Sequence, residues 1–98
     1  MIKVLIVEDS PVMQQLLAYT ISSDPDLNIV GYAEDGEKAI ELVRKLSPDI
    51  VAMDWYMPKL DGYEATRIIM ETNPTPIVIV TGSVNVHDVA FSFSMIDA

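Results

Sequence analysis

Short apolar runs alternate with amphipathic segments along the whole chain. Continuous apolar runs are typical of strands buried in a sheet, whereas apolar residues three and four apart indicate helices. The runs predict strands at 2–7, 27–33, 49–53 and 77–80, and the spaced pattern predicts helices at 11–22, 37–46 and 63–71, with a weaker helical pattern at 84–96. Four successive strand–helix units with short connections favour a parallel sheet covered by helices on both faces, an α/β doubly wound fold.

The first helix has the clearest start signal in the chain. Ser10 offers an N-cap, and Pro11 follows at the first helical position, where proline is well tolerated. The apolar spacing predicts a buried face that leaves Gln14, Gln15 and Ala18 outside and consists of Val12, Met13, Leu16, Leu17, Thr20 and Ile21.

Acidic residues follow two of the predicted strands. Glu8 and Asp9 come directly after the first strand, and Asp54 comes directly after the third. In the flavodoxin-like strand order 2-1-3-4-5, which we adopt by analogy, these two strands are neighbours and ligands bind beyond their carboxyl ends. We therefore expect the three carboxylates to converge on one small pocket.

Charge narrows the classes of partner. The 98 residues include 15 acidic and six basic side chains, which gives a net charge of −9. Such a surface repels nucleic acids and anionic membranes, so neither is expected as a partner, whereas a cation is favoured.

The chain has no cysteine, which excludes disulfides and thiolate metal sites, and its first apolar run is too short for a signal peptide or a membrane span. We expect a single cytoplasmic domain.

Three motifs carry a resemblance to a known family. They are 7–10 (Val-Glu-Asp-Ser), 53–62 (Met-Asp-Trp-Tyr-Met-Pro-Lys-Leu-Asp-Gly) and 80–82 (Val-Thr-Gly). Together they resemble the receiver domain of two-component response regulators, in register over the whole chain. Residues 10–13, 23–26 and 76–80 are most similar to the receiver half of chemotaxis methylesterases.

The resemblance implies a role for each candidate residue. Asp54 is the expected phosphoacceptor, which takes a phosphoryl group from a histidine kinase and thereby switches an output domain or a downstream protein. The expected cofactor is Mg²⁺, held by Glu8, Asp9, Asp54 and the backbone carbonyl of Tyr56, and Thr81 is the expected switch hydroxyl. The domain is not expected to be an enzyme itself, although a methylesterase output domain is a candidate for the longer protein.

Two departures from the family pattern lead to further expectations. Gly82 stands where receivers commonly have alanine, and the chain ends before the fifth strand, its lysine and the fifth helix. We therefore expect residues 1–98 to form a C-terminally incomplete receiver whose fourth strand, 77–80, is an open sheet edge prone to association.

Alternative interpretations remain at this point. Acids at strand ends also serve as helix caps, which is the role we expect for Asp61. The main functional alternative is a receiver-like interaction module that is not phosphorylated.

Overall fold

The computed structural model describes residues 1–54, 62–80 and 94–96. In chain order its elements are β1 (Ile2–Val7), α1 (Pro11–Ser22), β2 (Leu27–Ala33), α2 (Gly36–Leu46), β3 (Ile50–Asp54), α3 (Gly62–Thr72), β4 (Ile77–Val80) and β5 (Ser94–Ile96). The four strands and three helices predicted most clearly from the sequence are therefore confirmed. The one shift at the site is that Asp54 is the last residue of β3 and not the first residue after it.

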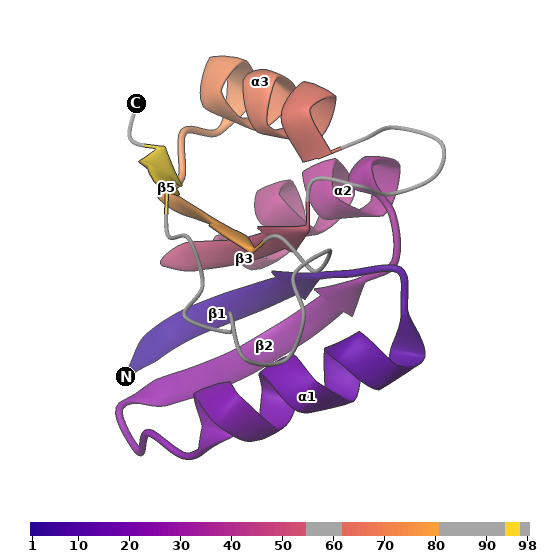
Figure 1. Cartoon of the computed structure of the whole chain (residues 1–98). Coiled ribbons are helices and arrows are strands. Elements are labelled where there is room, and N and C mark those ends of the chain that lie inside the picture. Colours follow the sequence, from indigo (N-terminus) through magenta and orange to yellow (C-terminus); the bar gives the residue numbers. More distant parts are fainter. Residues whose placement is uncertain (55–61, 81–93, 97–98) are drawn as a thin grey trace.

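The strands form one sheet in the order β2-β1-β3-β4-β5 (Figure 1). The pairs β1–β2, β1–β3 and β3–β4 are parallel. Helix α1 covers one face of the sheet, while α2 and α3 lie on the other (Figure 1). The predicted doubly wound α/β fold is thus confirmed, and the carboxyl ends of β1 and β3 lie next to each other, as the adopted strand order requires.

Alternation along the strands divides the core into two layers. The layer between the sheet and the pair α2 and α3 contains Leu5, Val7, Val51, Met53, Ile77 and Ile79 from the strands, with Ala39, Val43, Ala65 and Ile69 from the helices. The layer beneath α1 contains Val4, Ile6, Ala52, Val80 and Leu17. Even-numbered positions of β1, β3 and β4 therefore face α1, and this row continues into the acidic residues at the strand ends.

Helix α1 is turned relative to the face predicted from its sequence. Leu17 is buried, and Ala18 and Ile21 pack beside it, but Val12 is 74% exposed and Leu16 is 46% exposed. The prediction was wrong for these positions because apolar residues lie on two sides of α1, and spacing alone does not decide which side meets the sheet. The observed rotation also brings Gln14 out of full solvent exposure.

The last three described residues contradict the helix predicted at 84–96. Residues Ser94–Ile96 form β5, which pairs antiparallel with β4. An unpaired strand edge offers free N–H and C=O groups, and pairing with an extended segment satisfies them, so this pairing outweighs a weak helical pattern. The prediction that β4 is an open edge is therefore wrong, although β5 is not the parallel fifth strand of the family pattern. Residues 84–93 of the predicted helix lie outside the described part of the chain.

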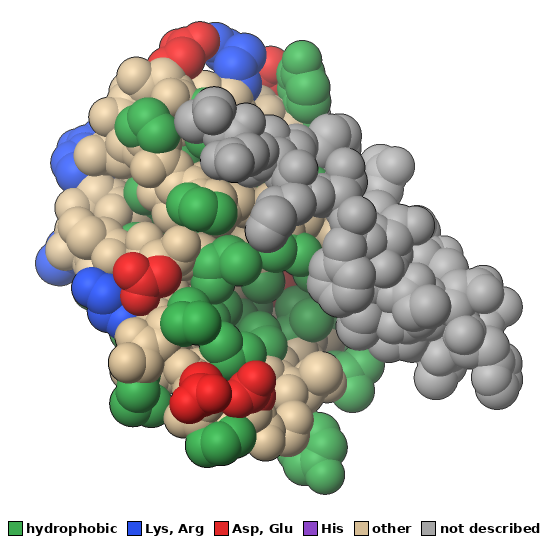
Figure 2. Space-filling view, turned by 90° about the vertical axis from the view of Figure 1, so that its left-hand side faces the viewer, with side chains coloured by type: hydrophobic (Ala, Val, Ile, Leu, Met, Phe, Trp, Pro, Cys, Tyr) green, Lys and Arg blue, Asp and Glu red, His purple; other side chains and the backbone are tan. Residues whose placement is uncertain are grey.

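An apolar hollow of about 280 Å³ opens beside α1. Figure 2 views the molecule from the side where the strands begin and shows hydrophobic side chains gathered in the middle of that face. The hollow is lined by residues of α1 and of strands β1 to β4, which are Ile2, Val4, Leu17, Thr20, Ile21, Leu27, Ile50, Ala52, Val78 and Val80. Within residues 1–54, 62–80 and 94–96, no helix has the length and apolar character needed to cross a membrane.

Candidate functional site

Strand register brings Glu8 and Asp54 together. In the β1–β3 pair, Val7 lies opposite Met53, so the next residues along the two strands are Glu8 and Asp54. Both are at even positions, which face α1, so their side chains leave the sheet on the same side. The same alternation that buries Ile6 and Ala52 thus sets two carboxylates side by side.

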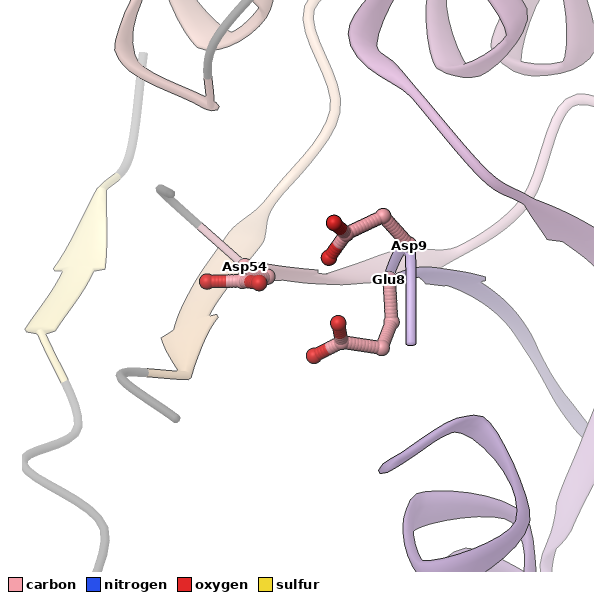
Figure 3. Close-up of side chains that lie close together, drawn as sticks. All are labelled: Glu8, Asp9 and Asp54. Carbon is pink, nitrogen blue, oxygen red and sulfur yellow. The ribbon is translucent and has the colours of Figure 1, made fainter. Parts of the chain in front are cut away.

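Asp9 completes a cluster of three carboxylates. One carboxylate oxygen from each of Glu8, Asp9 and Asp54 lies within 4.8 Å of the others. Glu8 is 2% exposed and Asp54 is 6% exposed, whereas Asp9 lies at the surface. Figure 3 shows the Glu8 and Asp9 carboxylates on the side of their backbone that faces Asp54. The predicted convergence is therefore confirmed.

The loop between β1 and α1 is held by its own hydrogen bonds. The Ser10 backbone N–H donates to Glu8 Oε2 at 3.0 Å. Ser10 Oγ accepts from the Met13 N–H at 3.4 Å, so the predicted N-cap of α1 is present. The Gln14 side-chain Nε2 donates to the Glu8 backbone carbonyl at 2.6 Å. The start of α1 therefore constrains both the side chain and the backbone of Glu8.

The environment of Glu8 favours its neutral form. The pKa of the Glu8 carboxyl is raised from 4.5 to about 7, mainly by burial, with further raising contributions from the hydrogen bond with Asp9 and the negative charge of Asp54 and an opposing contribution from the Ser10 N–H. A cation near Glu8 would reverse this preference by stabilising the ionised carboxylate.

The cluster can compensate its charge by binding a cation. At a separation of 4.8 Å or less, two ionised carboxylates of the cluster repel by at least about 3.5 kcal/mol at an effective dielectric constant of 20. Three carboxylates supply hard oxygen donors, which select Mg²⁺ or Ca²⁺ over softer metals. The donor set therefore fits a small divalent cation.

Another acid near the end of a strand, Asp35, has a structural role instead. Asp35 follows β2, and its Oδ1 accepts the Lys38 N–H at 2.8 Å as the N-cap of α2. Among the described residues, the group of acids close enough to share a metal ion is Glu8, Asp9 and Asp54, without Asp35. The alternative reading of strand-end acids as helix caps thus holds for Asp35.

Several residues singled out in the sequence lie outside the described part of the chain. They are Tyr56 and Thr81, together with Asp61 and Gly82. Val80 pairs with Asp54 across β3 and β4, and Thr81 is the next residue in the sequence. The contact of Gln14 with the Glu8 carbonyl was not predicted from the sequence. The available signal was the position of Gln14 one turn into a helix, because helical side chains lean toward the N-terminal end.

A family model and the most similar proteins point to the same family. Residues 4–96 match the family model of the response regulator receiver domain. The chain is 54% identical over its whole length to a protein-glutamate methylesterase/protein-glutamine glutaminase of Nitrosospira multiformis, and spans 28% of that protein. A second protein of that name, from Geobacter metallireducens, is 47% identical and again 28% covered.

Solved structures agree with the sequence relatives. The response regulator domain of Thermotoga maritima CheB superposes with a TM-score of 0.80 and 39% identity, covering 91% of this chain and 69% of that one. The CheX–CheY–BeF3–Mg²⁺ complex of Borrelia burgdorferi gives a TM-score of 0.77 and 32% identity, covering 82% of this chain and 61% of that one.

Proposed function

Because this chain belongs to the response regulator receiver domain family, we propose that it accepts a phosphoryl group on Asp54 and thereby controls an output domain or a downstream protein. The observation that carries the proposal is the position of Asp54 at the tip of β3, within 4.8 Å of two further carboxylates. A histidine kinase is the proposed phosphoryl donor. The receiver itself is a signalling module.

Transfer of a phosphoryl group to Asp54 requires mainly that the carboxylate nucleophile is correctly positioned. An oxygen of the Asp54 carboxylate forms a bond to phosphorus while the phosphorus–nitrogen bond of the donor phosphohistidine breaks, and the released imidazole keeps the electron pair. Phosphoryl transfer depends mainly on positioning and charge stabilisation. The tip of the buried strand β3 supplies the positioning, because Asp54 is paired with Val80 on one side and adjoins Glu8 on the other.

We propose that Glu8, Asp9 and Asp54 hold Mg²⁺, together with the backbone carbonyl of Tyr56. When bound, Mg²⁺ would offset the negative charge on the phosphoryl oxygens. The three-carboxylate donor set supports this proposal, as does the 32% identity to a chain of the CheX–CheY–BeF3–Mg²⁺ complex. Thr81, the residue after Val80, is proposed to bond a phosphoryl oxygen and to act as the switch.

The output is proposed from the relatives. We infer that residues 1–98 correspond to a receiver domain. The chain spans 28% of the methylesterase/glutaminase proteins that it matches. A methylesterase output domain in chemotaxis is therefore the leading candidate for what phosphorylation of Asp54 controls.

Phosphorylation from a small donor tests the proposal. Acetyl phosphate with Mg²⁺ should add one phosphoryl group to the protein, detected by intact mass and lost on treatment with hydroxylamine. Chelation of Mg²⁺ should prevent the addition. An unmodified protein after long incubation with donor and Mg²⁺ would favour the alternative, an interaction module that is not phosphorylated.

Replacement of Asp9 by alanine should weaken Mg²⁺ binding at least about tenfold. Removing a residue that hydrogen-bonds to a metal ligand typically lowers metal affinity 10–100-fold. Asp9 offers a carboxylate oxygen directly to the cluster, so its loss should cost at least as much. Isothermal calorimetry measures the dissociation constant. Asp24→Ala is the matched control, because Asp24 is exposed in the turn between α1 and β2. Equal affinities for the Asp9→Ala variant and the unmodified protein would refute the role of Asp9.

A further inference from the structure

Gln14 connects α1 to the backbone of the acidic cluster. Its side-chain Nε2 donates to the Glu8 carbonyl at 2.6 Å, six residues back along the chain, in a partly buried position. Side chains on a helix lean toward its N-terminal end. A long amide one turn into α1 is therefore well placed to reach back over the Ser10 cap to the end of β1.

The Glu8 carbonyl is a sensitive point of this loop. The Glu8 N–H is still part of the sheet, since it donates to the Ala33 carbonyl at 2.9 Å. The Glu8 carbonyl belongs to the next peptide, which links Glu8 to Asp9. Because a peptide group is planar, a hydrogen bond to its oxygen restricts rotation of the whole plane, and that plane sets the position of the Asp9 Cα.

Anchoring of this peptide depends on α1 itself being fixed. Leu17 is 5% exposed and packs in the layer beneath α1 with Ile6 and Ala52. Ser10 caps the helix through Met13 and also donates to the Glu8 carboxylate. Gln14 thus extends from a helix that is fixed by packing. Its hydrogen bond holds the Glu8–Asp9 peptide in a defined position relative to that helix.

We propose that Gln14 is a positioning residue of the acidic cluster. Through the Glu8 carbonyl it holds the Glu8–Asp9 peptide in the orientation that keeps the Asp9 carboxylate beside Glu8 and Asp54. The inference rests on the proposed function, because it concerns the same cation site. Without the Gln14 donor, the peptide can rotate and carry Asp9 away from the other two carboxylates.

The test compares Gln14→Met, which has a similar length and no donor, with Gln15→Met. Gln15 is the exposed neighbour on the same turn of α1. Gln14→Met should raise the Mg²⁺ dissociation constant about tenfold, and Gln15→Met should leave it within about twofold of the unmodified protein. Gln14→Arg restores a donor and should recover affinity, and Gln15→Arg controls for the added positive charge.

A second readout uses the protein without metal. In ¹H–¹⁵N spectra recorded with a chelator, Gln14→Met should shift the backbone amides of Asp9 and Ser10, whereas Gln15→Met should not. Unchanged amide shifts, or unchanged Mg²⁺ affinity in a folded Gln14→Met protein, would overturn the inference while leaving the proposed function intact. Absence of Mg²⁺ binding by the unmodified protein would overturn both.

Discussion

Replacing Asp54 with asparagine is expected to abolish phosphoryl uptake, to below about 1% of the unmodified protein. The amide keeps the size of the side chain and its place at the tip of β3, but it lacks the anionic oxygen that attacks phosphorus. Mg²⁺ affinity should fall as well, because one of the three carboxylates is lost. Intact-mass measurement after incubation with acetyl phosphate and Mg²⁺ gives the extent of phosphorylation.

Asp49 provides the matched control at the other end of the same strand. Asp49 immediately precedes β3, is exposed, and accepts the Lys3 N–H through Oδ2 at 2.7 Å. Asp49→Asn should therefore leave phosphorylation unchanged. Peptide mapping of the phosphorylated protein should place the group on Asp54. Phosphate on Asp9, Asp61 or Thr81, or full uptake by the Asp54→Asn variant, would assign the acceptor elsewhere.

The sheet was predictable because parallel strands buried on both faces read as continuous apolar runs. The runs 4–7, 50–53 and 77–80 belong to such strands and are largely buried, whereas the run 27–33 forms the edge strand β2 and is only partly buried. Each run ends near proline, glycine or acidic residues that break the pattern. The order of the strands could not be predicted in this way, because apolar runs alone do not specify which strands pair. It was taken by analogy from the flavodoxin-like pattern.

The three acidic residues of the site were also predictable from the sequence. An acid directly after a buried strand lies at the carboxyl end of that strand, and the neighbouring parallel strands β1 and β3 place Glu8, Asp9 and Asp54 at the same edge of the sheet. What the sequence did not reveal was the raised pKa of Glu8, because burial of that carboxyl depends on how closely α1 and the neighbouring strand pack around it.

The remaining errors have a common cause in tertiary contacts. Apolar residues on two sides of α1 left its rotation undetermined, and packing of Leu17 against Ile6 and Ala52 decided it. The same rotation allowed Gln14 to reach the Glu8 carbonyl. At the other end of the chain, pairing with β4 made a strand of residues 94–96 in spite of a helical pattern. Pairing with a neighbouring strand can therefore outweigh a local preference for helix.

Acidification is expected to weaken Mg²⁺ binding about 30-fold between pH 8 and pH 5.5. Burial, Asp9 and Asp54 raise the pKa of Glu8 from 4.5 to about 7, and a cation prefers the ionised carboxylate, so binding releases a proton. Below the pKa, each pH unit then costs up to about tenfold in affinity. Calorimetry at several pH values, in buffers with different ionisation enthalpies, gives both the affinity and the number of protons released.

Without a cation the same group acts on stability in the opposite direction. The pKa of Glu8 is raised in the folded protein, so the protonated form is favoured by folding, and the unfolded chain releases that proton first as the pH rises. The free energy of unfolding should therefore fall between about pH 4.5 and pH 7, by at most about 1.4 kcal/mol per pH unit. Glu8→Gln removes the titrating group and should flatten both the stability curve and the Mg²⁺ profile. A Glu8→Gln protein that keeps the full pH dependence of Mg²⁺ affinity would show that another group in the cluster carries the proton.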